Sequence, residues 1–244
     1  MAAHLANVIQ RREVLPGKNY TQKKPIEIEY TLGDSTLQET KSHTYLGVEI
    51  TNDLKWAKHI NNITAKANRS LGFIRRNLVS CPQDLKATAY TTLVRPLLEY
   101  SSIVWDTHVL EQIKKIESVQ RRAARFVKND YSRESSPSSM ISTLGWDSLE
   151  QRRKVARVTM MHKIANGQAA IPERTFLQPV NRRTKHHHSK AYQRPTGTKD
   201  CWVHSYFPKT IKDWNQLPNE IITIESTKQF KKEVTNHYNT PHST

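Results

Sequence analysis

Two long stretches of this chain place an apolar residue at every third or fourth position, and this spacing predicts amphipathic helices. The first stretch runs from Leu54 to Leu78, and the second runs from Val109 to Lys128. The inward residues of the first are Trp56, Ile60, Ile63, Ala67, Leu71, Ile74 and Leu78. The inward residues of the second are Ile113, Ile116, Val119, Ala123 and Phe126.

A further helix is expected between these two, beginning near Pro82, because proline suits the first turn of a helix. Pro96 falls inside the same pattern, so we expect a kink there rather than one straight rod. The inward residues expected for this helix are Leu85, Ala89, Leu93 and Leu97. Three amphipathic helices with short connections predict a bundle that buries their apolar stripes.

The N-terminal part has a different pattern, in which apolar and polar residues alternate over short stretches. Residues 26–30 and 44–50 have this period of two, so we expect each to be a strand. Gly33-Asp34 is a candidate turn into residues 35–37, and we expect residues 26–50 to form a small antiparallel meander. Gly47 interrupts the second stretch, which indicates a bulge or a close approach to the backbone. Asn52 or Asp53 is expected to cap the helix that follows.

The C-terminal part predicts further helices joined by polar segments. One begins at Asp147-Ser148-Leu149-Glu150, which offers a cap followed by an acidic first turn, and runs to about Asn166, where Gly167 suits a C-terminal stop. The last begins at Ser226, where Gln229 completes a capping box. Residues 174–199 are basic and poor in apolar side chains, which predicts a solvated loop. The expected fold is therefore mainly α, with a small antiparallel β element, a helical bundle and a helical C-terminal region.

The net charge indicates which class of ligand the surface of this chain attracts. The chain carries 38 Lys and Arg against 22 Asp and Glu, a formal net charge of +16. Such a surface attracts phosphate backbones, because each neutralised phosphate releases condensed counterions. A surface that only confers solubility is the alternative.

The sequence also predicts the cellular compartment of the protein. No stretch approaches the roughly 20 apolar residues of a spanning helix, so no membrane partner is expected. The N-terminal residues do not have the pattern of a secretory signal. Cys81 and Cys201 are too far apart for a zinc knuckle or a disulfide framework. We therefore expect a protein that is not secreted and lies in the nucleus or the cytoplasm.

The basic residues of the predicted helices and of the loop are the candidate binding residues. Arginine's planar fork contacts phosphate oxygens in pairs, so it positions a duplex without reading its sequence. Taken alone, such a charge run is more often a solvated helix face. The candidates are Lys66, Arg69, Arg75, Arg76, Arg121, Arg122, Arg125, Lys128, Arg182, Arg183 and Lys185.

No catalytic residue is assigned. Two-metal phosphoryl transfer needs clustered carboxylates, and the chain has no adjacent pair of aspartates. The aspartates near predicted helix ends are expected to be caps or turn residues. These are Asp53, Asp84, Asp106 and Asp130.

The tryptophans and the histidine run could bind ligands, but each also has an ordinary structural explanation. The tryptophans are expected to pack in the core rather than to stack on bases. These are Trp56, Trp105, Trp146 and Trp214. The histidines of 186–188 lack the converging, supported ligands of a metal site, so contact with phosphate is the expected role of this loop.

Several short phrases follow one another in a recognisable order along residues 43–232. They include Tyr45-Leu46-Gly47-Val48, Leu71-Gly72-Phe73-Ile74-Arg75-Arg76, Leu93-Val94-Arg95-Pro96-Leu97-Leu98-Glu99-Tyr100, Val119-Gln120-Arg121-Arg122-Ala123-Ala124-Arg125-Phe126 and Phe207-Pro208-Lys209-Thr210-Ile211-Lys212-Asp213-Trp214-Asn215. Together they resemble the end of the palm, the thumb and the downstream part of jockey-like, LINE-type non-LTR retrotransposon reverse transcriptases.

The resemblance implies a division of the chain. Residues 1–50 would hold the end of the palm, 51–131 the thumb, and 132–244 a C-terminal region containing the basic loop. The primer-grip-like hairpin would consist of Tyr45, Leu46, Gly47 and Val48.

The resemblance also implies partners. The family's catalytic Tyr-x-Asp-Asp motif and its endonuclease domain are expected upstream of residue 1, so Mg²⁺ is expected only in that missing palm and no cofactor in this chain. The implied ligands are an RNA–DNA or DNA duplex and the element's own RNA, held without polymerisation by this chain alone. Two alternatives stay open: a self-standing, domesticated RNA- or DNA-binding adaptor, and a basic helical scaffold. The residues do not specify an oligomeric state.

Overall fold

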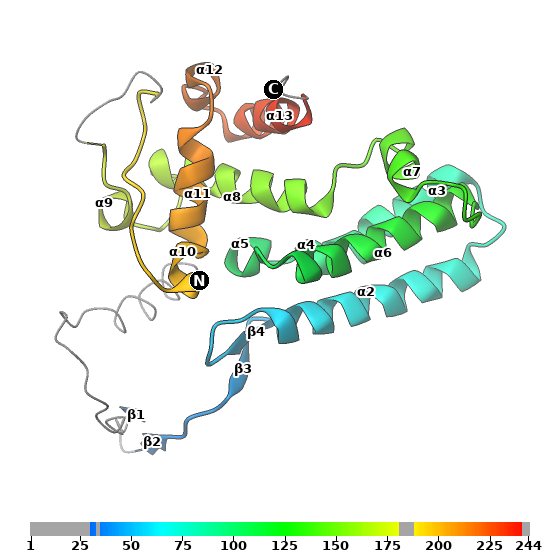
Figure 1. The fold of residues 1–244 in the computed structure, drawn as a ribbon, viewed down its shortest axis with the longest axis horizontal. Coiled ribbons are helices and arrows are strands. Elements are labelled where there is room, and N and C mark those ends of the chain that lie inside the picture. Colours follow the sequence, from blue (N-terminus) through cyan, green and yellow to red (C-terminus); the bar gives the residue numbers. More distant parts are fainter. Residues whose placement is uncertain (1–29, 33–34, 181–187, 241–244) are drawn as a thin grey trace. The chain divides into compact units, whose positions relative to one another are not determined.

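The computed structural model describes residues 30–32, 35–180 and 188–240. The chain divides into two compact units, Met1–Lys55 and Trp56–Thr244, and each is described by itself. The fold is mainly helical with small antiparallel hairpins near the N-terminus, which confirms the expected fold class (Figure 1). Among the described residues, no helix is both long and apolar enough to cross a membrane.

In the part of the first unit that the structure describes, the strands form two hairpins rather than one meander. Most of the expected strand over 26–30 lies outside the described residues. Strand β1 (Tyr30–Leu32) pairs antiparallel with β2 (Ser35–Leu37), and β3 (Ser42–Tyr45) pairs antiparallel with β4 (Val48–Thr51). The two sheets share no strand. The expected single strand over 44–50 is therefore wrong, because the chain reverses inside it.

The reversal occurs at the glycine that was expected to be a bulge. Tyr45 pairs with Val48, and the two residues between them both have positive φ, 46° at Leu46 and 81° at Gly47. Two consecutive positive φ angles are the signature of a type I′ turn, whose twist matches that of the flanking strands. Leu46 adopts this conformation despite its side chain, which is strained for a residue other than glycine.

The expected helix cap is also different. Asp53 Oδ1 accepts hydrogen bonds from the Thr51 hydroxyl at 2.6 Å and from the Lys55 N–H at 3.2 Å. Asp53 therefore closes a local turn. The residue before helix α2 (Ala57–Asn77) is Trp56, and its side chain makes no capping hydrogen bond.

The second unit begins with the predicted bundle. Helix α2 and helix α6 (Leu110–Lys128) lie side by side and run in the same direction (Figure 1). The predicted inward residues of both helices are buried, apart from the end residues Trp56 and Leu78 of the first, which are half-buried. The apolar period therefore identified both helices correctly.

The middle helix of the bundle is made of three consecutive pieces, α3 (Gln83–Ala89), the π-helical turn η1 (Tyr90–Val94) and α4 (Arg95–Glu99). The Arg95 N–H bonds to the carbonyl of Tyr90, five residues back. The irregularity predicted at Pro96 therefore lies just before it, as a wider turn rather than a break. Short helix α5 (Ser102–Trp105) leads from this element towards α6.

The buried face of this middle helix is displaced by one residue from most of the expected one, although Ala89 is buried as predicted and Leu97 is half-buried. Leu85 and Leu93 are 49% and 54% exposed, so their predicted inward positions are wrong. The buried side chains are Lys86, Ala89, Tyr90, Val94 and Leu98. A spacing of four residues fits both the expected row, which contains Leu85 and Leu93, and the buried row, which contains Lys86 and Val94. Spacing alone therefore does not distinguish the two rows. The Tyr90 hydroxyl donates to Gln120 Oε1 at 2.9 Å, a buried hydrogen bond that apolar spacing cannot reveal.

The C-terminal part packs on helix α8 (Leu149–Ala165), which follows short helix α7 (Pro137–Thr143). Ser148 caps α8 by accepting the Gln151 N–H at 3.1 Å, and Gly167 has a φ of 66° beyond its end. Both ends were predicted. Helices α11 (Tyr206–Asn215) and α13 (Thr227–Asn239) lie against α8. The remaining short helices are α9 (Glu173–Phe176), α10 (Asp200–Val203) and α12 (Asn219–Ile222).

Part of the expected solvated loop belongs to this core. Among the described residues of 174–199, Leu177, His188, Ala191 and Tyr192 are buried, so the expectation is wrong for them. A ring nitrogen of His188 lies 3.0 Å from the carbonyl of Trp214. This histidine packs on α11, so its environment is structural. Trp214 and Trp105 are fully buried, as predicted for core tryptophans, while Trp56 and Trp146 are half-buried.

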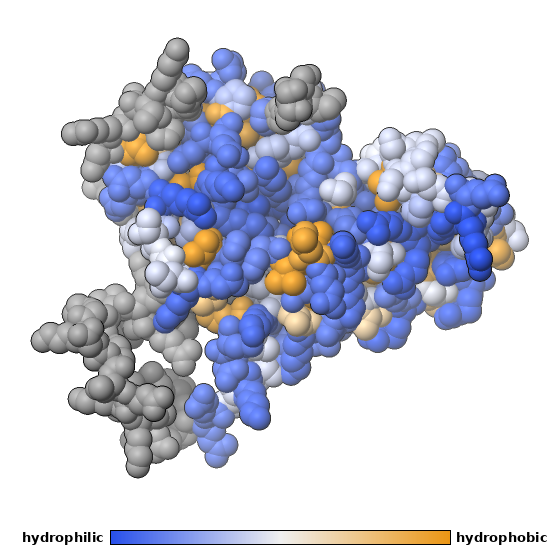
Figure 2. Space-filling model, in the orientation of Figure 1, coloured by the Kyte–Doolittle hydropathy of each residue, from blue (hydrophilic) through white to orange (hydrophobic). Residues whose placement is uncertain are grey.

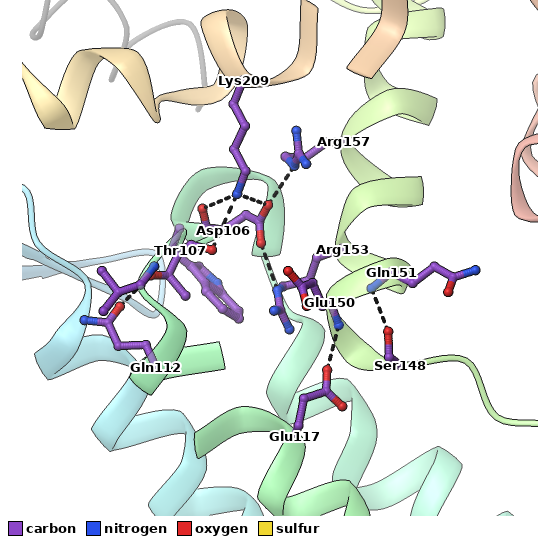
Figure 3. A network of polar contacts seen from close by, with 12 residues as sticks. Asp106, Thr107, Gln112, Glu117, Ser148, Glu150, Gln151, Arg153, Arg157 and Lys209 are labelled. Carbon is purple, nitrogen blue, oxygen red and sulfur yellow. Dashed lines mark hydrogen bonds and ion pairs between the residues drawn. The ribbon is translucent and has the colours of Figure 1, made fainter. Parts of the chain in front are cut away.

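A buried ion network joins the bundle to the C-terminal helices (Figure 3). Asp106 Oδ1 accepts from Arg153 at 2.9 Å, and its Oδ2 lies 2.7 Å from Arg157 and 2.6 Å from Lys209. The expected cap or turn role of Asp106 is therefore wrong. Burial raises the pKa of this carboxyl, but the three cations outweigh that effect and hold the pKa below its usual value.

Candidate nucleic-acid interface

Helices α2 and α6 meet along a seam with two hydrogen bonds, and a cation–π contact to the segment after α6 continues the row. The Lys115 ammonium donates to Asn61 Oδ1, and Arg122 donates to Asn68 Oδ1 at 2.8 Å. One step further, the guanidinium of Arg75 lies 5.5 Å from the centre of the Tyr131 ring. On α2 the three positions are 61, 68 and 75, so each step is seven residues, or about 10 Å of helix.

The amide partners matter because they carry no charge. A carboxylate facing Arg122 would cancel most of its attraction for an anion, whereas the amide oxygen of Asn68 only accepts a hydrogen bond. Arg122 also donates to the Ser118 hydroxyl at 3.0 Å, a second uncharged acceptor. The guanidinium is therefore held in place with its full positive charge.

Tyr131 reaches the end of the seam because of how α6 stops. Asn129 adopts a left-handed φ of 53°, and the Asp130 N–H bonds back to the carbonyl of Arg125 at 3.1 Å. Such a left-handed residue ends a helix and turns the chain aside. Asp130 Oδ1 then accepts the Ser132 N–H at 2.9 Å, the turn role that was predicted for it. Tyr131 is 52% exposed.

Two further rows of cations flank the seam. Arg69 and Arg76 lie on the outer side of α2, and Lys114 and Arg121 lie on the outer side of α6, again seven residues apart in each row. We call the two rows and the seam cations together the basic face. It consists of Arg69, Arg75, Arg76, Lys114, Lys115, Arg121 and Arg122.

Carboxylates are scarce near the basic face. Helix α2 contains none, and α6 contains Glu111 in its first turn and Glu117. Glu117 turns towards α8, where its carboxylate accepts the backbone N–H of Glu150 at 2.8 Å (Figure 3). Among the described residues, no cation of the basic face forms an ion pair with a carboxylate.

The face is therefore polar and predominantly positive, with the exposed Glu111 one helical turn before Lys115. Figure 2 shows hydrophilic residues over most of the visible side of the described chain, with apolar residues in separate small patches. A polar surface of this kind suits a ligand with many exposed charges, such as a phosphate backbone, better than an apolar partner.

The other predicted binding residues are not part of this face. Arg125 donates to the carbonyls of Ser132 at 2.8 Å and Ser135 at 3.1 Å, so its fork holds the segment after α6. Lys128 is half-buried in the last turn of α6. Lys66 is exposed, on the edge of α2 that faces away from α6.

The remaining predicted residues lie elsewhere in the chain. Arg182, Arg183 and Lys185 are outside the described residues, as are His186 and His187. The primer-grip-like residues belong to the first unit. Tyr45 and Leu46 are 46% and 56% exposed at the turn of its second hairpin.

Sequence reasoning missed the uncharged members of the seam. Asn61 and Asn68 were not singled out, although their seven-residue spacing repeats that of Lys115 and Arg122. A search for polar residues spaced by two helical turns on both helices would have found them. Tyr131 had no such signal, because it lies beyond the predicted helix.

Comparisons with protein-family models, with curated proteins and with solved structures found no match to this chain.

Proposed function

We propose that this chain binds nucleic-acid duplexes through their phosphate backbones, using the basic face of α2 and α6. The proposal rests on one observation: Lys115 and Arg122 are oriented by the amides of Asn61 and Asn68, and neither forms an ion pair with a carboxylate among the described residues. Preoriented donors lose less side-chain freedom on binding than free ones. Their spacing of about 10 Å matches about three nucleotide steps of a duplex strand.

The resemblance to LINE-type reverse transcriptases extends this proposal to a role. The bundle would act as a thumb that grips an RNA–DNA or DNA duplex, or the element's RNA. DNA synthesis would need Mg²⁺ and carboxylates from a palm domain. This chain, which has no adjacent aspartates, is expected to add no nucleotides by itself. Such a role would be carried out in the nucleus or the cytoplasm.

The proposal is tested by reversing two charges of the face. Fluorescence anisotropy would measure the Kd of the chain for a 5′-labelled RNA–DNA hybrid of about 20 base pairs, long enough to cover the face. We expect Arg121→Glu together with Arg122→Glu to weaken binding about tenfold or more, since each lost phosphate contact removes counterion release.

The matched control reverses two exposed lysines of α13, Lys228→Glu and Lys232→Glu, with the same change in net charge. The control is expected to lose less than about threefold. Equal losses in both variants would mean that total charge, rather than the basic face, attracts the duplex. If neither variant changed the Kd for the duplex, the alternative of a basic helical scaffold would be favoured, because the charges of the face would then play no part in binding. Circular dichroism would establish that both variants are folded.

A further inference from the structure

Three side chains with metal-binding atoms meet where the loop before α6 lies against α10. Asp200 is in the first turn of α10 and His204 follows its last residue, so they are four residues apart on one turn. His108 Nε2 lies 3.2 Å from Asp200 Oδ2, and His204 Nε2 lies 3.5 Å from Asp200 Oδ1. The potential ligand atoms of the three residues all lie within 4.8 Å of one another.

Both supporting segments are held by contacts of their own. Before His108, the buried Thr107 donates its hydroxyl to Gln112 Oε1 at 2.6 Å and accepts the Val109 N–H at 3.0 Å. Within α10, the Trp202 indole donates to the carbonyl of Thr196, in the segment before the helix, at 3.2 Å. Ligands on restrained segments lose less freedom on binding an ion.

A glycine makes the second of these contacts possible. The indole of Trp202 lies directly over Gly197, and a Cβ atom there would be 2.0 Å from the ring. Any other residue at 197 would displace the indole and with it the start of α10. The position of Asp200 and His204 is therefore built into the local sequence.

The two imidazoles are packed against each other. The rings of His108 and His204 are stacked, with centroids 3.5 Å apart and an interplanar angle of 10°. This stacking holds both rings beside the carboxylate of Asp200, which each approaches through its Nε2 atom.

We propose that His108, Asp200 and His204 form a binding site for a divalent transition metal such as Zn²⁺. Zinc takes two imidazole nitrogens and a carboxylate oxygen at about 2.0–2.2 Å, which requires ligand atoms about 3.3 Å apart. Asp200 is 76% exposed and the two imidazoles about one third, so the three side chains have room to rotate. The two rings would tilt out of their stack so that both Nε2 atoms face one ion. Mg²⁺ and Ca²⁺ prefer oxygen ligands and would not bind here.

The fourth coordination position would open onto a cavity of about 370 Å³ that both histidines line. Lys209 and Arg194 also line this cavity. A water molecule or a small anion is the ligand that suits such surroundings. The ion would link the loop before α6 to α10, so binding should stabilise this part of the fold. This inference is independent of the proposed duplex binding.

The test is a titration of the full chain with zinc chloride by isothermal calorimetry. His186→Asn, His187→Asn and Cys201→Ser would first remove other soft ligands. In this background we expect one Zn²⁺ per chain, and Asp200→Asn or His204→Ala to weaken binding about tenfold or more. The control His43→Ala removes an exposed histidine of the first unit and should leave the affinity unchanged.

A second readout separates binding at this site from adventitious binding. Zn²⁺ should raise the Tm of the background protein, because it binds only the folded chain, and should not raise that of His204→Ala. Co²⁺ should give visible absorption bands that the same substitution removes. Folded protein that binds no zinc, or that binds it equally well after both substitutions, would overturn the proposal. Asp200 and His204 are exposed enough that both variants are expected to fold, which circular dichroism would establish.

Discussion

Arg122 of α6 donates a hydrogen bond of 2.8 Å to Asn68 of α2, and the two residues are 54 positions apart in the sequence. The same separation joins Lys115 to Asn61. Because the separation is constant, α2 and α6 run in parallel and in register along the seam. This register brings cations of α6 and uncharged acceptors of α2 together, and it is the geometric basis of the proposed duplex binding.

Replacing Asn68 with Asp should separate binding from stability. The new carboxylate would pair with Arg122, so we expect the free energy of unfolding to stay equal or rise by up to about 1 kcal/mol. Duplex affinity should fall, and its salt dependence should weaken by about one phosphate contact. Chemical denaturation and anisotropy measure the two effects. The control Asn236→Asp places the same charge on an exposed position of α13; a similar loss of affinity there would argue against the seam.

Tyr131 should matter only when a base is free to stack. Its ring is half exposed and lies beside Arg75, an arrangement suited to stacking on an unpaired base. We expect Tyr131→Ala to cost about 1–3 kcal/mol of binding to a duplex with a single-stranded overhang. A blunt duplex should bind equally well before and after the change. Tyr131→Phe keeps the ring and should behave as wild type, and an equal loss on both ligands would refute stacking.

Asp106 should be among the most sensitive positions for folding. Asp106→Asn keeps the shape of the side chain but leaves Arg153, Arg157 and Lys209 without their shared carboxylate. Removing one partner of a buried ion pair typically costs about 3–5 kcal/mol, and we expect a loss of that size in urea denaturation. The control Asp84→Asn changes an exposed position in the first turn of α3 and should lower the free energy of unfolding by only about a few tenths of a kcal/mol.

His162 should make stability depend on pH. This side chain is fully buried and stacked on Phe230, and burial, opposed by its hydrogen bond to Ile224, lowers its pKa. The unfolded chain then binds the proton more readily, so stability should be full above the unfolded pKa of about 6.5. It should decline as pH falls from there towards the lowered folded pKa. Denaturation at several pH values should show a smaller decline in His162→Asn, and His43→Asn should keep the wild-type slope.

How far the sequence predicts this structure depends on how local each signal is. The spacing of Ile60 to Ile74 and of Ile113 to Phe126 predicted α2 and α6, because helix formation and burial both follow from neighbours three or four residues away. The caps at Ser148 and Ser226 were equally local, and both accept the expected backbone N–H.

Features that depend on distant partners were missed. Asp106 lies 47 residues from Arg153 and 103 from Lys209. Nothing near Asp106 distinguishes an ion-network centre from a cap. Tyr90 similarly sets the buried face of its helix through a bond to Gln120, 30 residues away. The candidate site shows the same division. The arginines of the basic face were predicted one by one, whereas Lys114 and Lys115 were not among the predicted binding residues. The amides that orient Lys115 and Arg122 depend on the register of two helices.

The most direct test of the proposed function is the salt dependence of duplex binding. The logarithm of the binding constant would be measured against the logarithm of KCl concentration for a B-DNA duplex. It would be compared with the variant Lys115→Gln, Arg121→Gln and Arg122→Gln. If these three residues contact phosphates, the slope should become less steep by about 2–3, since each contact contributes about 0.9. The control Lys163→Gln, Lys228→Gln and Lys232→Gln, at exposed positions of α8 and α13, should keep the wild-type slope. An unchanged slope in the first variant, with a reduced slope in the control, would contradict binding through the basic face.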